Sequence, residues 1–255
     1  MQPLRQVYLS AIESGRSAAN QSEYDVRCEW GFDGLSRLAP ISDVLVIVDV
    51  LSFSTAVDIA VSNGAAILPY AANDDSASRY AAAAGAELAA PRRAGAGFSL
   101  SPASLRSIPA GHRLVLPSPN GSALAFSVDC ANTFTACLRN SAAVARLIAR
   151  VGSAFAVVPA GERWPGGALR PCLEDLVGAG AVLAGLPGRM SPEAELAIQA
   201  FRCFEGDLHR ALSGCTSGRE LIERGFANDV ALAAELNASR AVPWLKDRAF
   251  VNYPA

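Results

Sequence analysis

From about residue 43 onward, short runs of apolar residues alternate with longer segments whose apolar residues recur every three or four positions. The short runs predict β-strands, and the longer segments predict amphipathic helices. The predicted strands are 43–50, 65–70, 112–117, 131–137 and 154–160. The predicted helices are 54–63, 74–84, 140–151, 173–186, 192–212, 217–224 and 228–237. Residues 241–253 predict a further strand pair or an extended arm.

Strands that alternate with helices in this way are typical of an α/β fold. The uninterrupted apolar run 44–48 indicates a strand buried on both faces. We therefore predict a three-layer α/β/α fold with a largely buried mixed sheet. Residues 24–255 are predicted to form a single domain, preceded by a partly ordered extension over 1–23. The Gly- and Ser-rich segment 91–111 predicts a loop or lid, because the alternation resumes after it.

The composition favours a folded protein that binds a small molecule. Of the 255 residues, 51% are hydrophobic, which is enough to bury most of the chain in a core. The 22 basic and 24 acidic residues give a net charge of -2, so no uniform field favours nucleic acid or an anionic membrane. No apolar run approaches the roughly 20 residues that span a bilayer. We expect a cytoplasmic protein, with homodimerisation left open.

Cysteine, histidine and lysine contents exclude several chemistries. The six cysteines include no C-x-x-C pair and the chain has only two histidines, which argues against a zinc site. No cysteine is followed six residues later by arginine, so the loop of cysteine-nucleophile phosphatases is absent. Lys246 is the only lysine, which excludes the G-x-x-x-x-G-K-[ST] nucleotide loop.

Asp49 is the first candidate functional residue. It ends the predicted strand 43–50 and precedes a helix that begins with several hydroxyl side chains. Ligands of open α/β sheets bind at the carboxyl ends of strands, which places Asp49 well. It could instead only cap the helix by accepting hydrogen bonds from its first N–H groups. The dehalogenase-type motif D-x-D is excluded, since its second acid is replaced by Leu51.

The segment 118–122 follows another predicted strand and forms the second candidate. Its Asn-Gly pair permits a positive φ, and such a turn can direct successive N–H groups toward an anion. An ordinary turn is the simpler interpretation. The candidate phosphate-binding residues here are Ser118, Asn120, Gly121 and Ser122.

Arg139 and Asn140 form the third candidate, at the junction between the strand 131–137 and the next helix. Arginine binds phosphate or carboxylate through two parallel hydrogen bonds. Asn140 is suited to cap the helix. Arg139 could equally be a solvated surface residue, because arginine supplies almost all the basic residues of this chain.

The densest group of charges follows the strand 154–160 and combines arginines with acids. Its members are Glu162, Arg163, Arg170, Glu174 and Asp175. Such a mixture suits a metal ion together with an anion. Glu174 and Asp175 point in different directions from the predicted helix 173–186, so we expect only one of them to face a common site. Acids in a first helical turn also complement the helix dipole without further function.

Seven segments, in this order, resemble the 2-phosphosulfolactate phosphatase family. They are 26–35, 46–57, 118–122, 137–140, 160–164, 169–183 and 217–239. The resemblance implies a three-layer α/β/α, phosphatase-like domain over about 24–250. It also implies Mg²⁺-dependent hydrolysis of phosphate esters of 2-hydroxy acids, such as 2-phosphosulfolactate to sulfolactate and phosphate, a step associated with coenzyme M biosynthesis. One departure is Ser52, where family members usually carry arginine.

Together with this resemblance, the candidates acquire specific expected roles. Magnesium is typically held by one or two carboxylates plus the substrate phosphate. The expected catalytic residues are Asp49, Glu162 and Asp175, and the expected Mg²⁺ ligands are Asp49, Glu174 and Asp175. The expected substrate-binding residues are Ser118, Asn120, Gly121, Ser122, Arg139, Asn140, Arg163 and Arg170.

Two alternatives from other classes are considered. Ser52 in place of arginine raises the alternative of a non-catalytic anion-binding or regulatory module on the same fold. A nucleotide-dependent oxidoreductase would need G-x-G-x-x-G after the first predicted strand, where this chain reads DVLSFS. The phosphatase is therefore the favoured hypothesis, with a small-molecule phosphate ester as partner.

Overall fold

The structure is a computed structural model that describes residues 21–92, 97–128, 130 and 132–254. Most of the predicted N-terminal extension, 1–20, lies outside the described residues. Among those described, no helix is both long and apolar enough to cross a membrane.

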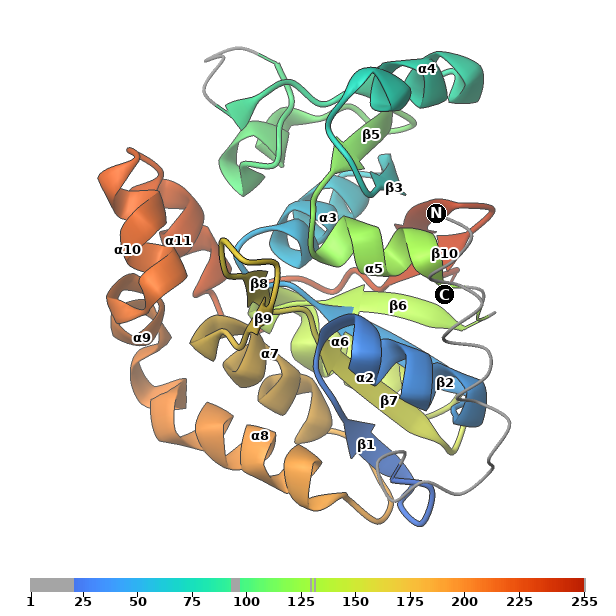
Figure 1. Ribbon diagram of the computed structural model, residues 1–255, viewed down its shortest axis with the longest axis vertical. Helices are drawn as coiled ribbons and strands as arrows, with labels where there is room; N and C mark the ends of the chain where they lie inside the picture. The colour runs from blue at the N-terminus through green and yellow to red at the C-terminus, as the bar shows by residue number, and fades with distance from the viewer. Residues whose placement is uncertain (1–20, 93–96, 129, 131, 255) are drawn as a thin grey trace.

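Nine strands of the described chain form one mixed sheet, in the order β1-β7-β2-β6-β10-β11-β3-β5-β4 (Figure 1). Their bounds are β1 Val26–Cys28, β2 Val44–Val48, β3 Ala66–Tyr70, β4 Glu87–Leu88, β5 Arg113–Pro117, β6 Thr133–Ala136, β7 Phe155–Pro159, β10 Pro243–Lys246 and β11 Ala249–Asn252. Two short strands, β8 (Glu162–Arg163) and β9 (Leu169–Arg170), pair separately as a hairpin. All five strands predicted from apolar runs are therefore confirmed.

The α-helices are α2 Gly31–Leu38, α3 Phe53–Ser62, α4 Asp75–Ala84, α5 Gly121–Ser127, α6 Ser141–Ile148, α7 Leu173–Leu183, α8 Pro192–Phe204, α9 Leu208–Gly214, α10 Thr216–Glu223 and α11 Ala227–Ala233. Short 3-10 helices are η2 Ala39–Ile41, η4 Pro102–Ser107, η5 Leu138–Asn140 and η6 Glu205–Asp207. The predicted helix 192–212 is thus two helices, α8 and α9, separated by η6.

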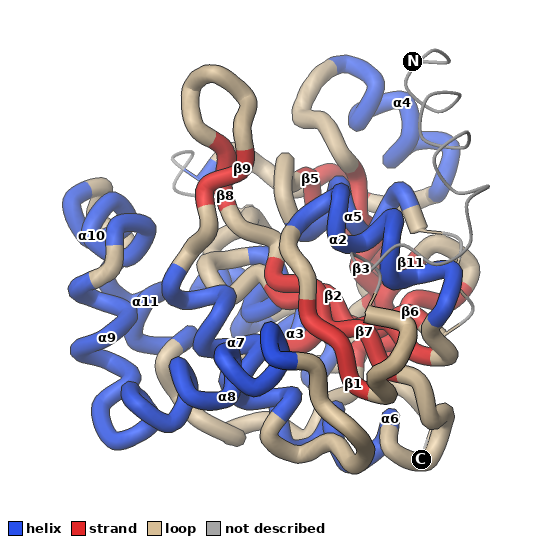
Figure 2. The backbone as a smooth tube through the Cα atoms, turned by 60° about the horizontal axis from the view of Figure 1, so that its bottom comes forward, coloured by secondary structure: helices blue, strands red, loops and turns tan. Residues whose placement is uncertain are grey.

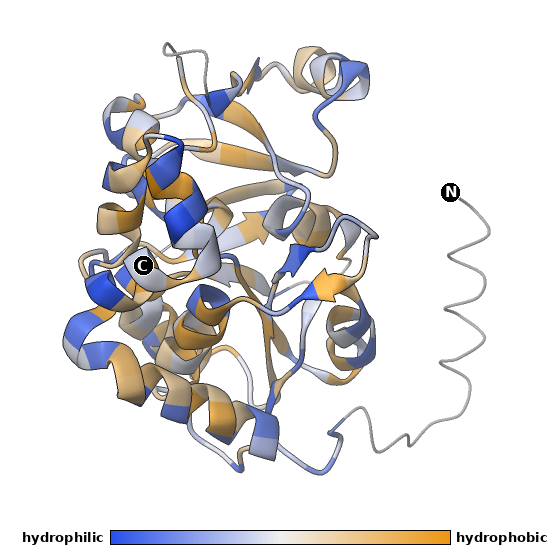
Figure 3. Cartoon of the chain, turned by 60° about the vertical axis from the view of Figure 1, so that its left-hand side comes forward, coloured by the Kyte–Doolittle hydropathy of each residue, from blue (hydrophilic) through white to orange (hydrophobic). Residues whose placement is uncertain are grey.

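Helices cover both faces of the sheet, which confirms the three-layer prediction. Along β2, Val46 and Val48 pack in the core that includes α6, α7 and α8, while Leu45 and Ile47 pack in the core that includes α2, α3 and α5. Every residue of β2 is buried, as its unbroken apolar run predicts. Figure 3 shows the strands coloured mainly as hydrophobic, with hydrophilic residues on the outer helices.

The C-terminal hairpin β10–β11 lies in the middle of the sheet rather than at an edge. It pairs antiparallel with β6 on one side and with β3 on the other. The strands β1, β7, β2 and β6 are parallel to one another, whereas β3, β5 and β4 run in the opposite sense. The prediction of a strand pair over 241–253 is confirmed, but its central place depends on contacts far apart in sequence.

Two glycines let α7 pack closely on both of its neighbours. A Cβ atom on Gly178 would lie only 2.5 Å from a methyl group of Val50, just after β2. A Cβ atom on Gly180 would collide with the carbonyl oxygen of Ala197 in α8. The helix therefore lies close against the end of β2, and Asp175 in its first turn accepts a hydrogen bond from the Val50 N–H.

Candidate active site

A cavity of about 540 Å³ lies where the loops after β2 and β5 meet. The hydrogen bond from the Gly121 N–H to Oδ2 of Asp49, 2.8 Å long, joins these two loops. Polar and charged residues of the cavity wall come from six separate segments of the chain. They are Asp49, Ser52, Asn73, Arg92, Ser118, Asn120, Glu162, Ser217, Glu220 and Arg224.

Asp49 is 5% exposed and is held by backbone groups from both loops. Besides the Gly121 N–H, its carboxylate accepts a hydrogen bond from the Phe53 N–H at 3.3 Å, and its own N–H donates to Oγ of Ser54 at 2.8 Å. The bond to Phe53 is the helix cap considered from the sequence. The cap does not exclude function, because the same carboxylate also lines the cavity.

The environment of Asp49 disfavours its charge. The pKa of Asp49 is raised to about 6. Burial is the main cause, and the nearby carboxylates of Glu162 and Glu174 contribute. The N–H groups of Gly121 and Phe53 act in the opposite direction. A buried acid with such a pKa is typical of functional sites, and a cation would favour its ionised form.

Asp175 lies behind the cavity and joins two loops. Its Oδ1 accepts a hydrogen bond from the Val50 N–H at 2.8 Å, and its Oδ2 accepts one from the Gly161 N–H at 2.9 Å. Burial, followed by the charges of Asp49 and Glu174, raises the pKa of Asp175 well above its ordinary value. Asp175 is not part of the cavity wall. Its visible role is to fix the loops after β2 and β7.

Both acids of α7 are buried, but their carboxylates contact different groups, so the expectation that only one of them faces a common site stays a prediction. Glu174 and Asp175 are each 3% exposed, because α7 is enclosed between the sheet and the helices α8 to α10. Glu174 lies beside Cys215: burial, then the charge and hydrogen bond of Glu174, raise the pKa of that thiol to about 12. Like Asp175, Glu174 is absent from the cavity wall.

The segment 118–122 divides between the cavity and the protein interior. Ser118 and Asn120 line the cavity. The Asn120 N–H donates to Oγ of Ser118 at 3.3 Å and the Gly121 N–H donates to Asp49, so these two N–H groups do not form the predicted anion nest. Ser122 is fully buried, and its hydroxyl donates to the Leu116 carbonyl at 2.5 Å. Ser122 therefore holds the start of α5 in place.

Glu162 lies at the rim, where the cavity adjoins a smaller one of about 190 Å³. Its Oε1 accepts hydrogen bonds from Nδ2 of Asn120 and from the Arg163 N–H, both at 3.0 Å. The structure thus brings Asp49, Asn120 and Glu162 to one cavity, although they lie far apart in the sequence.

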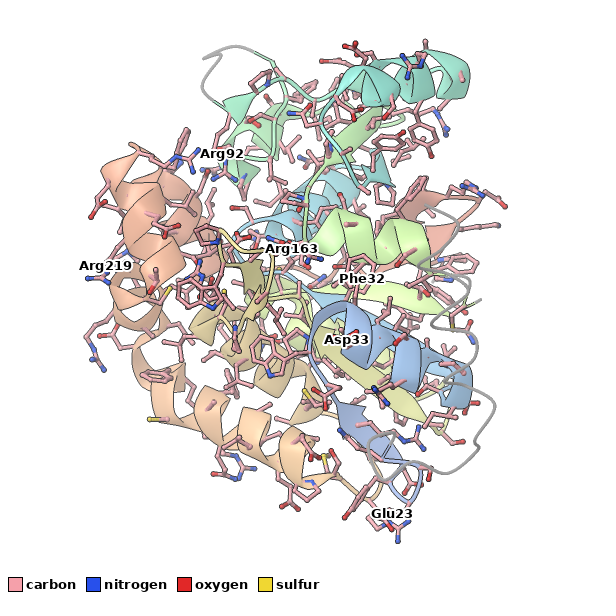
Figure 4. The ribbon with its side chains drawn as sticks, viewed as in Figure 1. Glu23, Phe32, Asp33, Arg92, Arg163 and Arg219 are labelled. Atoms are coloured by element: carbon pink, nitrogen blue, oxygen red, sulfur yellow. The ribbon has the colours of Figure 1, made fainter. Side chains whose placement is uncertain are left out.

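Arg163 and Arg170 lie on the β8–β9 hairpin, which projects from the body of the protein (Figure 2). Arg163 lines only the smaller cavity, where its guanidinium stacks over the ring of Phe32 with 5.8 Å to the centroid (Figure 4). Arg170 stacks over Trp164 at 5.6 Å. Neither lines the larger cavity.

Arg139 and Asn140 are held in structural contacts elsewhere. Nε of Arg139 pairs with Oδ2 of buried Asp58 at 2.9 Å, and its Nη1 pairs with Glu235. Asn140 is fully buried and accepts a hydrogen bond from the Cys137 N–H at 2.9 Å, which caps the following turn. Neither residue lines the cavity, so the geometry does not support the substrate-binding roles expected for them.

Sequence reasoning missed the two arginines that do line the cavity, Arg92 and Arg224. Arg92 lies in the segment read as a loop or lid, and Nη2 of its guanidinium donates to Oγ of Ser52 at 2.9 Å. A guanidinium is therefore present beside Ser52, the position at which the family resemblance led us to expect an arginine. Arg224 lies at the end of α10. Neither carries a local motif that could have revealed it.

The donors that face the cavity suit a magnesium ion in part. Within the described residues, no three His, Cys, Asp or Glu side chains are grouped so as to hold a metal ion. Magnesium, however, commonly binds through one or two carboxylates while substrate phosphate and water supply the other ligands. Asp49 and Glu162 provide two such carboxylates, and the charge of Glu162 contributes to the raised pKa of Asp49, which a bound cation would offset.

The structure is an α/β protein with a mixed sheet and a cavity lined by acids and arginines. A cavity of this kind suits a small, charged ligand. The model of the 2-phosphosulpholactate phosphatase family matches residues 34–248, and the chain belongs to this family. A protein of Gloeobacter violaceus described as a probable 2-phosphosulfolactate phosphatase is 31% identical over 211 residues, which cover 79% of this chain and 87% of that protein. The chain is accordingly a phosphoric monoester hydrolase of the 2-phosphosulfolactate phosphatase type.

Proposed function

We propose that this protein hydrolyses 2-phosphosulfolactate to sulfolactate and phosphate with the help of Mg²⁺. The observation that carries the proposal is the convergence of Asp49, Ser118, Asn120 and Glu162 on one cavity. These residues come from the loops after β2, β5 and β7, three strand ends of the sheet that the family resemblance covers.

In this proposal Asp49 and Glu162 hold the metal, which would neutralise phosphate charge and orient the ester. Oγ of Ser118 and Nδ2 of Asn120 would donate hydrogen bonds to phosphate oxygens, since both residues line the cavity beside Asp49 and Glu162. Asp175 keeps its supporting role, because its two hydrogen bonds position Val50 and Gly161 on either side of the site. Fixed donors of this kind need no rearrangement during the reaction.

A phosphate-release screen tests the proposal. Its substrates are 2-phosphosulfolactate, 2-phospholactate, phosphoglycolate and sugar phosphates, each with Mg²⁺ and with excess chelator. We expect release that requires Mg²⁺ and is fastest with 2-phosphosulfolactate. Equal rates in chelator would contradict the metal requirement, and faster turnover of sugar phosphates would contradict the substrate. No release from any ester would favour the non-catalytic anion-binding module.

A further inference from the structure

The cavity contains two guanidinium groups that metal binding and phosphate hydrolysis leave unused. Arg92 lies between the helices α10 and α11 and the segment before η4 (Figure 4), and Arg224 follows α10. Both line the same 540 Å³ cavity as Asp49. Arg92 is mostly buried, whereas Arg224 is exposed to solvent at the end of α10, so the two place one fixed and one accessible guanidinium on the cavity that Asp49 also lines.

Arg92 is held in a fixed orientation by four different contacts. Its Nη2 donates to Oγ of Ser52 and to the Leu100 carbonyl, both at 2.9 Å. Its guanidinium stacks over Phe226 with 5.1 Å to the ring centroid, and its Nη1 lies 3.8 Å from Oδ2 of Asp229. The side chain is only 11% exposed. A guanidinium fixed in this way loses little further freedom when it binds an anion.

Part of this guanidinium remains available to a ligand. Within the described residues, Nε and Nη1 of Arg92 donate no hydrogen bond, and the contact with Asp229 is too long to be one. Oδ1 of Asp229 accepts hydrogen bonds from the Ser101 hydroxyl at 2.6 Å and from the Ala103 N–H at 3.2 Å, whereas Oδ2, which lies 3.8 Å from Nη1 of Arg92, accepts no hydrogen bond within the described residues. Asp229 therefore offsets the charge of Arg92 but leaves Nε and Nη1 able to donate to a ligand.

Arg224 supplies a second positive charge close to the first. Burial lowers the pKa of Arg92, the charge of Asp229 opposes this, and the charge of Arg224 lowers it further. An anion bound near both guanidiniums would be attracted to each of them and would offset the repulsion that Arg92 experiences from Arg224. Ser217, on the same helix as Arg224, adds a hydroxyl to this wall.

We propose that Arg92 and Arg224 form a second anion subsite, which takes the non-reacting sulfonate of the substrate and makes the enzyme selective for esters that carry one. This inference rests on the proposed function for its substrate. It assigns the selectivity to two residues that lie outside the phosphate-binding loop and outside the hairpin β8–β9. Arg163 and Arg170, the arginines expected from sequence, do not line this cavity.

The matched substrates 2-phosphosulfolactate and 2-phospholactate test the subsite, because they differ in the sulfonate. We expect Arg224→Ala to lower kcat/KM for 2-phosphosulfolactate by roughly ten- to a hundredfold, mainly through KM, and to change that for 2-phospholactate less than about threefold. Arg92→Lys keeps a charge but loses the planar fork, and should lower the same preference. Arg219→Ala is the control, since Arg219 lies on the outer side of α10 (Figure 4) and does not line the cavity.

Binding of sulfoacetate, which carries a sulfonate and a carboxylate but no phosphate, tests the subsite without turnover. Calorimetry should show binding to the wild type and to Arg219→Ala, and at least about tenfold weaker binding to Arg224→Ala and Arg92→Lys. Equal binding by all four proteins, or an unchanged substrate preference in both cavity variants, would overturn the subsite. Absence of phosphate release with the sulfoacetate pattern intact would instead overturn only the proposed function.

Discussion

At the residue scale, the site is organised around carboxylates that are held by backbone N–H groups. Asp49 accepts from Gly121 and Phe53, and Asp175 accepts from Val50 and Gly161. These four hydrogen bonds fix the loops after β2, β5 and β7 relative to one another. Burial and the charges of neighbouring acids, Glu174 among them, nevertheless raise the pKa of both Asp49 and Asp175, so ionising them is costly without a cation.

This cost predicts how stability depends on pH. Folded Asp49 has a pKa of about 6 against an ordinary value of 3.8, so between these values the folded state binds more protons than the unfolded state. Stability should therefore fall as pH rises from about 4 to 7, by about 3 kcal/mol from Asp49 alone at neutral pH. In chelator, Asp49→Asn should melt on the order of 6 °C above the wild type at pH 7.5, with a smaller difference at pH 4.

Mg²⁺ should reverse this effect, because it binds the ionised carboxylate. Thermal melting with and without Mg²⁺ should show a larger stabilisation of the wild type at pH 7.5 than at pH 5, and little stabilisation of Asp49→Asn. Parallel melting curves of the two proteins at all pH values would show that Asp49 titrates normally.

At the element scale, the start of α5 must approach the end of β2 very closely. A Cβ atom on Gly121 would lie 2.7 Å from Oδ2 and 2.9 Å from Cβ of Asp49, and would collide with the ring of Phe53. Gly121 is therefore required mainly because it has no side chain, and less because it permits a turn. Without a Cβ atom, its N–H can approach and donate to the carboxylate of Asp49.

Gly121→Ala should separate these two elements. We expect unfolding free energy to fall by about 1–3 kcal/mol through overpacking, and phosphate release to fall with it as Asp49 is displaced. Gly214→Ala is a suitable control, because no atom lies within 4 Å of the position of its added Cβ at the end of α9. Denaturant unfolding and initial rates measure both effects. Native stability and rate in Gly121→Ala would contradict the close approach.

At the scale of the whole molecule, local patterns predicted the elements but not the partners of the charged residues. The apolar run of β2 was sufficient to predict a strand buried on both faces, since such a strand has an apolar residue at every position. The hydrophobic patterns of the short strand β1 and of the helices α2 and α5 are weaker, and these three elements were not predicted. The family resemblance added the order of the motifs and the chemistry.

The sequence predicted four residues of the cavity wall, each of which follows the end of a strand by at most three positions. They are Asp49, Ser118, Asn120 and Glu162. Arg139 also follows the end of a strand, but its neighbour Asp58 lies on α3, so a pairing across 81 residues removes it from the site. Arg92 and Arg224 enter the cavity from a long loop and a helix end. Contacts at such distances cannot be read from one sequence.

The central claim is that Asp49 supports Mg²⁺-dependent phosphate-ester hydrolysis, and kcat/KM of Asp49→Asn for 2-phosphosulfolactate across a Mg²⁺ titration tests it most directly. Asp43→Asn is the control, because Asp43 precedes β2 at the opposite end and its carboxylate accepts hydrogen bonds from Ser153 and Ala154, which do not line the cavity. We predict a fall of at least about a thousandfold, roughly 4 kcal/mol, for Asp49→Asn with folding retained, and near-native turnover for Asp43→Asn. Near-native turnover by folded Asp49→Asn would contradict the account.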